Sequence, residues 1–323
     1  MSVGLYGDLA VVSGTCHPEL AAAVCEYLRV NPTPMMVKKF PNENIFVRLE
    51  QSVRAMDVFL IQPLGSPVND MVMELLITLD AIRRDSAGRI TAVVPYYAYG
   101  RTDKKDQPRV PITARLLADL ITVAGAERFL TIDLHAGQIQ GFFTIPNDEL
   151  TARYLLVDYL RSHNLHRNAV IVSPDIGGVR RARNFAEDLN IPLAIIEKRR
   201  TPDGERTEFY NLIGQVEGRT CIMVDDEIDT GGTLCHASEF LKAHGATNVL
   251  AVATHPVFSA SAPERLAAAP IDRVIVTNTL PIAAAKRERL GDKLIEISVA
   301  SLLGEAIRRI HQGISVGAMY QHV

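Results

Sequence analysis

Residues 221–233 read Cys221-Ile-Met-Val-Asp-Asp-Glu-Ile-Asp-Thr-Gly-Gly-Thr, a short apolar run followed by acids, a glycine pair and the start of a helix-like sequence. The apolar run has the length of a strand that is buried on both faces. Residues 232–244 then carry apolar side chains three and four positions apart, the spacing of one face of a helix. A buried strand that leads into a helix is typical of a parallel sheet covered by helices, so this stretch predicts an α/β fold.

The same alternation continues on both sides of this stretch. Apolar runs predict strands at 9–12, 58–61, 90–95, 129–132, 169–173, 193–196, 221–224, 249–254 and 274–277. Amphipathic spacing predicts helices at 18–29, 69–83, 111–124, 149–163, 178–189 and 232–244. The 323 residues correspond to about two domains of typical size. No linker rich in glycine or serine divides them, so we place the boundary near residue 150, at the turn-forming Pro146-Asn147-Asp148.

The composition excludes several classes of protein. The chain has 34 basic and 37 acidic residues, so it lacks the basic excess of proteins that coat nucleic acid or anionic membranes. No apolar run reaches the ~18 residues of a membrane span, and no Lys or Arg precedes Arg29 as in a signal peptide. We therefore predict a cytoplasmic protein that binds neither nucleic acid nor membrane. The four cysteines form no CxxC pair and are expected to be reduced thiols.

The acids and glycines of 221–233 predict a site for a phosphorylated sugar. The glycine pair 231–232 lets the backbone approach an anion, and the amides at the start of the following helix, assisted by the neighbouring threonine hydroxyls, can bind a phosphate. The acids at 225–226 lie at the end of the strand, where open α/β sheets bind ligands, and carboxylates accept hydrogen bonds from vicinal hydroxyls such as those of ribose. The alternative is an acidic turn that only caps a helix.

Two strings in the sequence resemble known motifs. VDDEIDTGGT at 224–233 resembles the phosphoribosyl pyrophosphate loop of type I phosphoribosyltransferases and of ribose-phosphate pyrophosphokinases. DLHAGQIQGFF at 133–143, followed by Pro146-Asn-Asp148, resembles a long motif of the pyrophosphokinases that simple phosphoribosyltransferases lack. The resemblance continues to the terminal helix and tail at 305–316. A phosphoribosyltransferase would leave the second string unexplained, and a catalytically silent subunit of the family is the other alternative.

The resemblance implies residues for both substrates. Residues 96–109 place four cations among turn-forming residues and resemble the family's flexible ATP loop, although a solvated charge run is the alternative. Residues 40–44 resemble its adenine-recognition segment, which reaches across from a neighbouring subunit. The implied ATP-binding residues are Phe40, Asn42, Asn44, Arg101, Thr102, Asp103, Lys104, Lys105, Arg109 and His135. The implied ribose 5-phosphate-binding residues are Asp225, Asp226, Asp229, Thr230, Gly231, Gly232 and Thr233.

Two of the ATP-binding positions depart from the family's usual pattern. Asn44 stands where the family usually has Glu, and Thr102 where it usually has Gln. The preference of this chain among nucleotides therefore stays open.

Catalysis, metal binding and regulation are implied in the same way. Lys198 and Arg200 match the positions that stabilise the transition state, although three consecutive cations could also mark a solvent-facing strand edge. His135 and Asp175 are the implied ligands of Mg²⁺, since an Asp-x-His at a strand end and an exposed acid suit a hard cation and its phosphates. The implied regulatory positions for phosphate and ADP are Arg54, Ser86, Gln140, Asp148 and Ser315.

As a whole, the resemblance implies two similar phosphoribosyltransferase-like domains, each a mainly parallel sheet flanked by helices. We expect domains at 1–150 and 151–302, with the tail at 303–323 packing on the first. The implied reaction is transfer of the pyrophosphoryl group of ATP to the 1-hydroxyl of ribose 5-phosphate, which gives 5-phosphoribosyl 1-pyrophosphate and AMP. The implied assembly is a homohexamer built from dimers.

Overall fold

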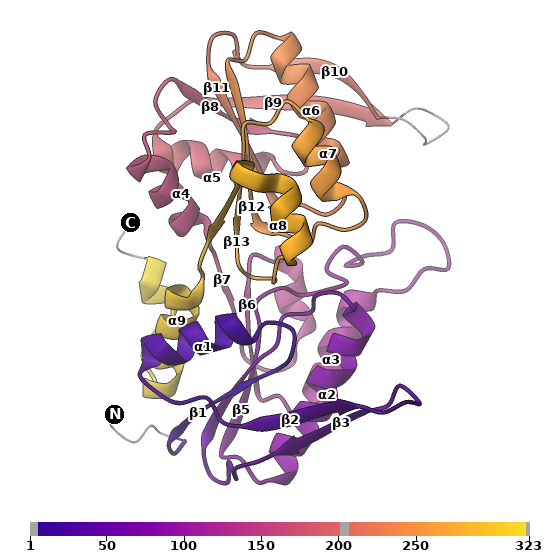
Figure 1. Ribbon diagram of the computed structural model, residues 1–323, viewed down its shortest axis with the longest axis vertical. Coiled ribbons are helices and arrows are strands. Elements are labelled where there is room, and N and C mark those ends of the chain that lie inside the picture. The colour runs from indigo at the N-terminus through magenta and orange to yellow at the C-terminus, as the bar shows by residue number, and fades with distance from the viewer. Residues whose placement is uncertain (1–5, 201–206, 321–323) are drawn as a thin grey trace. The chain divides into compact units, whose positions relative to one another are not determined.

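The computed structural model describes residues 6–200 and 207–320, and for 198–200, 207–210 and 320 it describes the backbone alone. The chain divides into two compact units. Unit 1 comprises Met1–Thr151, Thr279–Pro281 and Ser298–Val323, and unit 2 comprises Ala152–Asn278 and Ile282–Ile297. Each unit is an α/β structure with its own sheet (Figure 1). None of the helices in the described ranges is both long and apolar enough to cross a bilayer.

Unit 1 is built on a five-stranded parallel sheet with the order β1-β4-β5-β6-β7. Helix α1 packs against α9, and α2 packs against α3. A separate antiparallel hairpin, β2–β3, lies beside α2 (Figure 1). The elements of unit 1 are β1 Leu9–Ser13, α1 Pro18–Leu28, β2 Met35–Lys39, β3 Ile45–Leu49, β4 Asp57–Ile61, α2 Val68–Arg84, β5 Arg89–Val94, α3 Thr113–Ala124, β6 Arg128–Ile132, the 3-10 helix η1 Gly137–Phe142, β7 Asn147–Leu150, α9 Ala300–Gln312 and the 3-10 helix η3 Gly317–Tyr320.

Unit 2 is built on a seven-stranded sheet with the order β10-β9-β8-β11-β12-β13-β14, in which only the β9–β10 pair is antiparallel. Its elements are α4 Arg153–Ser162, β8 Ala169–Ser173, α5 Val179–Leu189, β9 Leu193–Arg200, β10 Thr207–Ile213, β11 Thr220–Glu227, α6 Gly232–Ala243, β12 Asn248–His255, α7 Ala262–Ala268, β13 Arg273–Thr277, α8 Ala284–Leu290, the 3-10 helix η2 Gly291–Lys293 and β14 Leu294–Ile297.

Strand β11 shows why an unbroken apolar run suits the centre of this sheet. Its side chains alternate between two separate cores, with Cys221 and Met223 on one face and Ile222 and Val224 on the other. Helices α6 and α7 contribute to the first core, and α4 and α5 contribute to the second. Because both faces are covered, all four side chains are fully buried, as the sequence predicts.

The two units repeat one arrangement. The order β1-β4-β5-β6-β7 in unit 1 matches β8-β11-β12-β13-β14 in unit 2, and every pair in both series is parallel. This confirms the predicted fold class of two similar α/β domains. Strand β4 and the loop after it therefore correspond to β11 and the sugar-phosphate loop, which we define as residues 228–233.

All nine predicted strands are present, and β2, β3, β7, β10 and β14 are additional to them. The prediction for residues 146–163 was wrong at its start. Asn147–Leu150 forms strand β7, paired in parallel with β6, and helix α4 begins only at Arg153. The turn expected at Pro146-Asn147-Asp148 is therefore largely a strand, which an ion pair between Arg128 on β6 and Asp148 helps to hold.

The carboxyl-terminal helix is fixed to unit 1 by a buried polar network. Asp57, at the start of β4, is fully buried and accepts two hydrogen bonds from Arg89, at 2.8 and 2.6 Å. Its Oδ2 also lies 2.8 Å from Nδ1 of His311 on α9. Arg89 donates in turn to the carbonyl of Ile310 at 3.1 Å. The buried carboxylate of Asp57 therefore depends on α9 for one of its partners.

Candidate functional site

The sugar-phosphate loop has the geometry of an anion site. Gly231 has a φ of +73°, in the left-handed region, and a Cβ there would lie 3.3 Å from Cγ of Leu266. Glycine is therefore the residue that fits both the backbone and the space. Helix α6 begins at Gly232, and Gly231 has no side chain to cap it. The first amides of α6 are thus available to a ligand, with the hydroxyls of Thr230 and Thr233 beside them in the chain.

The two acids before this loop form a coupled pair with an arginine. Nη1 of Arg181, on α5, lies 3.2 Å from Oδ1 of Asp225 and 3.1 Å from Oδ1 of Asp226. Oδ1 of Asp225 also accepts the amide of Asp226 at 2.9 Å. The side chain of Asp225 is 27% exposed and that of Asp226 only 5%, so a ligand reaches Asp225 more readily.

Burial and the neighbouring carboxyl of Asp226 raise the pKa of Asp225 to about 8, and the charge of Arg181 opposes this shift. The Asp225–Asp226 pair therefore keeps a proton to a higher pH than a lone carboxyl does. Arg181 is a site residue that the sequence analysis did not single out. The signal was present, because Arg181 lies in the first turn of the helix that follows the glycine pair 177–178.

Asp175 lies at the same edge of the sheet. It follows β8, which pairs in parallel with β11, and the carboxyl ends of neighbouring parallel strands meet at one edge. Its Oδ1 accepts the amide of Gly178 at 2.9 Å, and the hydroxyl of Ser173 donates to its carbonyl at 2.6 Å. These bonds fix the turn that carries Asp175 at this edge of the sheet.

In unit 1, most of the predicted ATP residues lie on the loops after β5 and β6. A Cβ placed on Gly100 would lie 3.5 Å from Cβ of His135, so the segment that begins at Arg101 starts next to this histidine. The buried carboxylate of Asp103 accepts a hydrogen bond from Nε2 of Gln138, which ties the two loops together. The cationic residues of the segment, Arg101, Lys104, Lys105 and Arg109, are exposed.

Phe40, Asn42 and Asn44 lie in the tight turn that follows strand β2. The amide of Phe40 donates to the carbonyl of Asn44 at 2.8 Å, and the amide of Asn44 donates to Oδ1 of Asn42 at 3.2 Å. The Asn42 side chain therefore helps to form the turn. The ring of Phe40 is 39% exposed, with its centroid 6.0 Å from that of Phe46 and 5.3 Å from Nζ of Lys38. An aromatic ring that is exposed in this way can stack on a base.

Comparison with known proteins shows the family. Residues 9–125 match the N-terminal domain of ribose phosphate pyrophosphokinase, and residues 201–321 match the phosphoribosyl synthetase-associated domain. The ribose-phosphate pyrophosphokinase of Nostoc sp. is 49% identical over 314 residues, 97% of this chain and 94% of that protein. The chain belongs to the ribose-phosphate pyrophosphokinase family.

Two further relatives agree with this assignment. The ribose-phosphate pyrophosphokinase of Aquifex aeolicus is 47% identical over 310 residues, 96% of this chain and 98% of that protein. The crystal structure of phosphoribosylpyrophosphate synthetase from Mycobacterium smegmatis is 45% identical, covers 95% of this chain and 99% of its own, and superposes with a TM-score of 0.89. The resemblance on which the sequence analysis rested is confirmed.

The two predicted catalytic cations of this family member lie on strand β9. The backbone of Lys198 pairs with Phe209 and that of Arg200 with Thr207, on the antiparallel strand β10. The side chains of Lys198 and Arg200 lie outside the described part of the structure.

The five predicted regulatory residues lie on different elements of unit 1. Arg54 and Ser86 are on adjoining exposed loops, joined by a 2.9 Å hydrogen bond from the amide of Ala55 to the carbonyl of Ser86. Gln140 donates to Glu149 on β7, the strand that also carries Asp148. Ser315 follows α9, and its carbonyl accepts a hydrogen bond from Arg309 at 2.9 Å.

The donor set at the acid edge of unit 2 fits magnesium. Among the side chains that the structure describes, no three of acidic, histidine or cysteine type form a metal cage. Mg²⁺ does not need one, because it binds proteins through one or two carboxylates plus substrate phosphates and keeps several waters. The Asp175 carboxylate meets this requirement. The imidazole of His135 is a less favoured ligand for this metal than oxygen.

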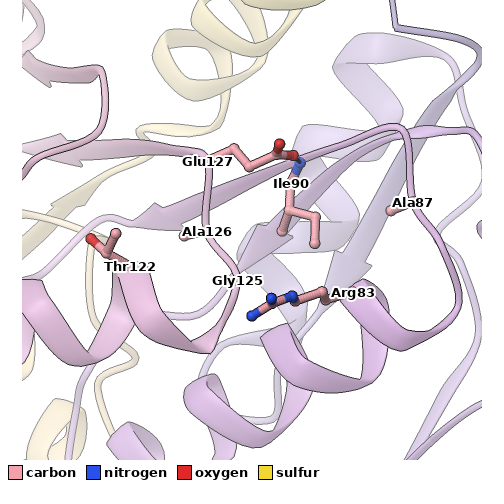
Figure 2. A pocket seen from close by; sticks show the side chains of 7 residues that line it. All are labelled: Arg83, Ala87, Ile90, Thr122, Gly125, Ala126 and Glu127. Atoms are coloured by element: carbon pink, nitrogen blue, oxygen red, sulfur yellow. Dashed lines mark hydrogen bonds between the residues drawn. The ribbon is translucent and has the colours of Figure 1, made fainter.

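A pocket of about 340 Å³ lies in unit 1 at the opposite end of the strands, where β5 and β6 begin (Figure 2). Both charged groups in this pocket bind backbone. Arg83 donates to the carbonyl of Val123 at 3.3 Å, and Glu127 accepts the amide of Ile90 at 3.0 Å. Arg83 and Glu127 thus satisfy backbone groups at the end of α3 and the start of β5. We therefore give this pocket no part in the reaction.

Proposed function

We propose that this protein transfers the pyrophosphoryl group of ATP to the 1-hydroxyl of ribose 5-phosphate, and so forms 5-phosphoribosyl 1-pyrophosphate and AMP. The observation that carries the proposal is the loop of unit 2, where a glycine turn at a helix start follows a pair of acids. This loop occurs in a chain that is similar over nearly its whole length to proteins named for this reaction.

The sugar-phosphate loop and the acids before it would bind ribose 5-phosphate. The 5-phosphate accepts hydrogen bonds from the first amides of α6 and from the hydroxyls of Thr230 and Thr233. The ribose hydroxyls donate to Asp225 and Asp226, which Arg181 holds in place. Asp229, Gly231 and Gly232 shape the turn between these two groups of contacts.

ATP would be bound by the residues of unit 1. Arg101, Lys104, Lys105 and Arg109 supply exposed positive charge for the polyphosphate, and His135 is next to the start of this segment. Asp103 is buried and bonded to Gln138, so we assign it the anchoring of the loop. Thr102 connects the same loop to α3, because its carbonyl accepts the amide of Ala114 at 3.2 Å. Phe40, Asn42 and Asn44 would contact adenine.

The reaction forms a bond between the sugar O1 and the β-phosphorus and breaks the bond between that phosphorus and the oxygen that leaves with AMP. The proton of the 1-hydroxyl is released. No covalent enzyme intermediate is required, so catalysis depends on positioning and on positive charge near the phosphates. Lys198 and Arg200 would supply that charge at the transition state. Asp175 and His135 are the residues that we assign to Mg²⁺, which would neutralise phosphate charge when bound.

Lys198→Ala should lower kcat by several orders of magnitude while the KM for ribose 5-phosphate changes little, because its charge acts on the transferring group. Steady-state kinetics with each substrate varied in turn measures both constants. Lys242→Ala is the control, since Lys242 binds Thr247 and Asp272 at the end of α6. An unchanged kcat would remove Lys198 from the catalytic role.

The assembly, effectors and location are part of the same proposal. Helix α3 carries an exposed apolar stripe, with Leu116 55%, Leu120 40% and Val123 74% exposed, which supports a homo-oligomer. A hexamer built from dimers, regulation by phosphate or ADP at the five positions named above, and a cytoplasmic location follow from the family resemblance. Analytical ultracentrifugation tests the hexamer, and activity assays with and without phosphate and ADP test the regulation.

The reaction itself is tested by phosphorus NMR of the purified protein with Mg²⁺, ATP and ribose 5-phosphate, with each component omitted in turn. AMP and a sugar-linked pyrophosphate should appear together and only in the complete mixture. If neither forms in folded protein, with phosphate added as a trial effector, the proposal fails and a silent subunit that binds an active partner takes its place.

A further inference from the structure

A short segment packs against the sugar-phosphate loop from the neighbouring strand. It consists of residues 256–261, which join β12 to α7, and we call it the support segment. The amide of Phe258 donates to the carbonyl of Ile228 at 2.8 Å, and the amide of Ser259 donates to the carbonyl of Asp229 at 3.0 Å. The backbone of the support segment is thus hydrogen-bonded to the loop up to Asp229, the residue before Thr230 and the glycine pair.

The support segment is itself firmly placed. Phe258 is fully buried in the core that contains Ile228, Leu234 and Leu266, although its φ of +46° is one that bulky residues rarely adopt. Burial of the ring holds this conformation in place. Leu266, on the helix that follows, is the residue that a Cβ on Gly231 would meet. The glycine turn therefore packs against the support segment and α7.

One side chain of the support segment reaches the loop. The hydroxyl of Ser259 donates a hydrogen bond to Oδ1 of Asp229, in addition to the backbone bond between the same two residues. A hydrogen bond to a carboxylate is stronger than one between neutral groups. Ser259 therefore fixes both the backbone and the carboxylate of Asp229, from which the chain turns into the glycine pair and α6.

We propose that Ser259 is a positioning residue for ribose 5-phosphate, which acts by holding Asp229 and the following turn in the shape that binds the sugar phosphate. This rests on the proposed function of the loop. Ser259 need not touch the substrate, because its effect passes through Asp229. A loop fixed before binding loses less conformational entropy when the ligand arrives, so loss of the hydroxyl should weaken binding of this substrate in particular.

Ser259→Ala tests the proposal. The KM for ribose 5-phosphate should rise about tenfold, and the KM for ATP, measured at saturating ribose 5-phosphate, should change less than twofold. Calorimetric binding of ribose 5-phosphate without ATP should weaken by the same factor. Ser259→Thr keeps the hydroxyl and should restore both values to within about threefold. Ser261→Ala is the matched control, since this serine is exposed and lies in the same segment.

Two further results decide the matter. In an Asp229→Ala background, Ser259→Ala should cause no additional loss of binding, because the hydroxyl has no carboxylate left to hold. If Ser259→Ala does not fold, Ser259→Cys, of similar size and with a weak donor, should show the same selective loss. Additive losses, equal losses for both substrates, or unchanged binding would each overturn the role of Ser259. Wild-type protein that binds no ribose 5-phosphate would instead overturn the proposed function.

Discussion

The loop after β4 in unit 1 and the loop after β11 in unit 2 occupy equivalent places in two similar sheets, yet they are built in opposite ways. After β11, a glycine turn leaves helix amides available to a ligand. After β4, the side chains of Gln62 and Leu64 are fully buried, and the carboxylate of Glu74, from α2, lies at this edge.

Glu74 is surrounded by the unit's own donors. It accepts the amide of Thr15 at 2.7 Å, the hydroxyl of the same residue at 2.6 Å and Nε2 of Gln62 at 3.2 Å. Only 2% of Glu74 is exposed. Unit 1 thus satisfies donors at its strand ends with its own buried anion, whereas in unit 2 we propose that the first amides of α6 bind a phosphate. On this proposal, the two units differ in whether an internal side chain or a ligand supplies the anion at the same place in the fold.

Among the variants that test this comparison, the largest expected effect comes from filling the space at the sugar-phosphate loop of unit 2. Gly231→Val would place a branched side chain at a φ of +73° and against Leu266. We expect kcat/KM for ribose 5-phosphate to fall at least about a hundredfold, equivalent to roughly 3 kcal/mol. Steady-state kinetics measures this. Gly218→Val, at another left-handed glycine with open space around it, controls for backbone strain. Equal losses in the two variants would argue against a special role for the turn.

The next largest effect comes from removing the internal anion of unit 1. Glu74→Ala leaves buried donors unpaired, so we expect unit 1 to lose about 3 kcal/mol of stability while the KM for ribose 5-phosphate stays within twofold. Calorimetry measures the loss of stability, and hydrogen exchange at the Thr15 amide shows whether the loss occurs at this edge of unit 1. Glu26→Ala, at an exposed position on α1, should change stability by less than about 0.5 kcal/mol. A KM that rises with the loss of stability would show that the edge of unit 1 around Glu74 affects binding at the sugar-phosphate loop.

A third variant tests how the charge of Arg181 affects the acid pair of unit 2. Arg181→Gln removes the charge that lowers the pKa of Asp225, so that pKa should rise above about 8. Because the deprotonated acid accepts the ribose hydroxyls, the KM for ribose 5-phosphate should rise about tenfold at pH 7 and recover as the pH approaches 9. Wild-type enzyme should show a shallower change in the same direction. Arg180→Gln, one residue earlier and exposed, serves as the control. A loss of binding that is independent of pH would contradict this explanation.

The smallest effect concerns Cys16, beside Glu74. Burial raises the pKa of this thiol to about 11, the backbone of Gly65 opposes the shift, and the charge of Glu74 adds to it. At pH 8 about one thiol in a thousand is ionised, so alkylation in the native protein should be slow. Glu74→Gln should speed modification of Cys16 a few-fold, as measured by mass spectrometry. An unchanged rate would mean that burial alone sets its reactivity.

The sequence predicts the central strands of both sheets well, because runs such as 221–224 are buried on both faces and are therefore uniformly apolar. It does not predict β7, because its first three residues, Asn147, Asp148 and Glu149, are polar and resemble a turn followed by a helix. The hairpin β2–β3 is also missed, because none of its residues is fully buried and Lys38, Lys39 and Arg48 are exposed. Strands that are not buried on both faces carry a weaker apolar signal in one sequence.

The site also contains parts that the sequence shows clearly and parts that it hides. The sugar-phosphate loop is visible in the sequence because its residues are contiguous and each has a chemical reason to be there. Arg181 and Ser259 are not visible, because they reach the acids and Asp229 from other segments, across 44 and 30 residues of chain. Glu74 is hidden for a similar reason, since an acid on an amphipathic helix is ordinarily a surface residue and only the fold shows that it is buried.

The dependence of Asp57 on His311 affects how this protein forms during translation. The ribosome makes α9 only after the whole of unit 2, so a nascent unit 1 has its sheet strands but lacks the helix that joins its buried carboxylate. At about 5 to 20 residues per second, the 160 positions between residues 150 and 310 take roughly 8 to 32 seconds to synthesise. Unit 2, which comes later, can complete its core first. During that interval the surface of α1 that packs against α9 in the folded protein has no partner helix.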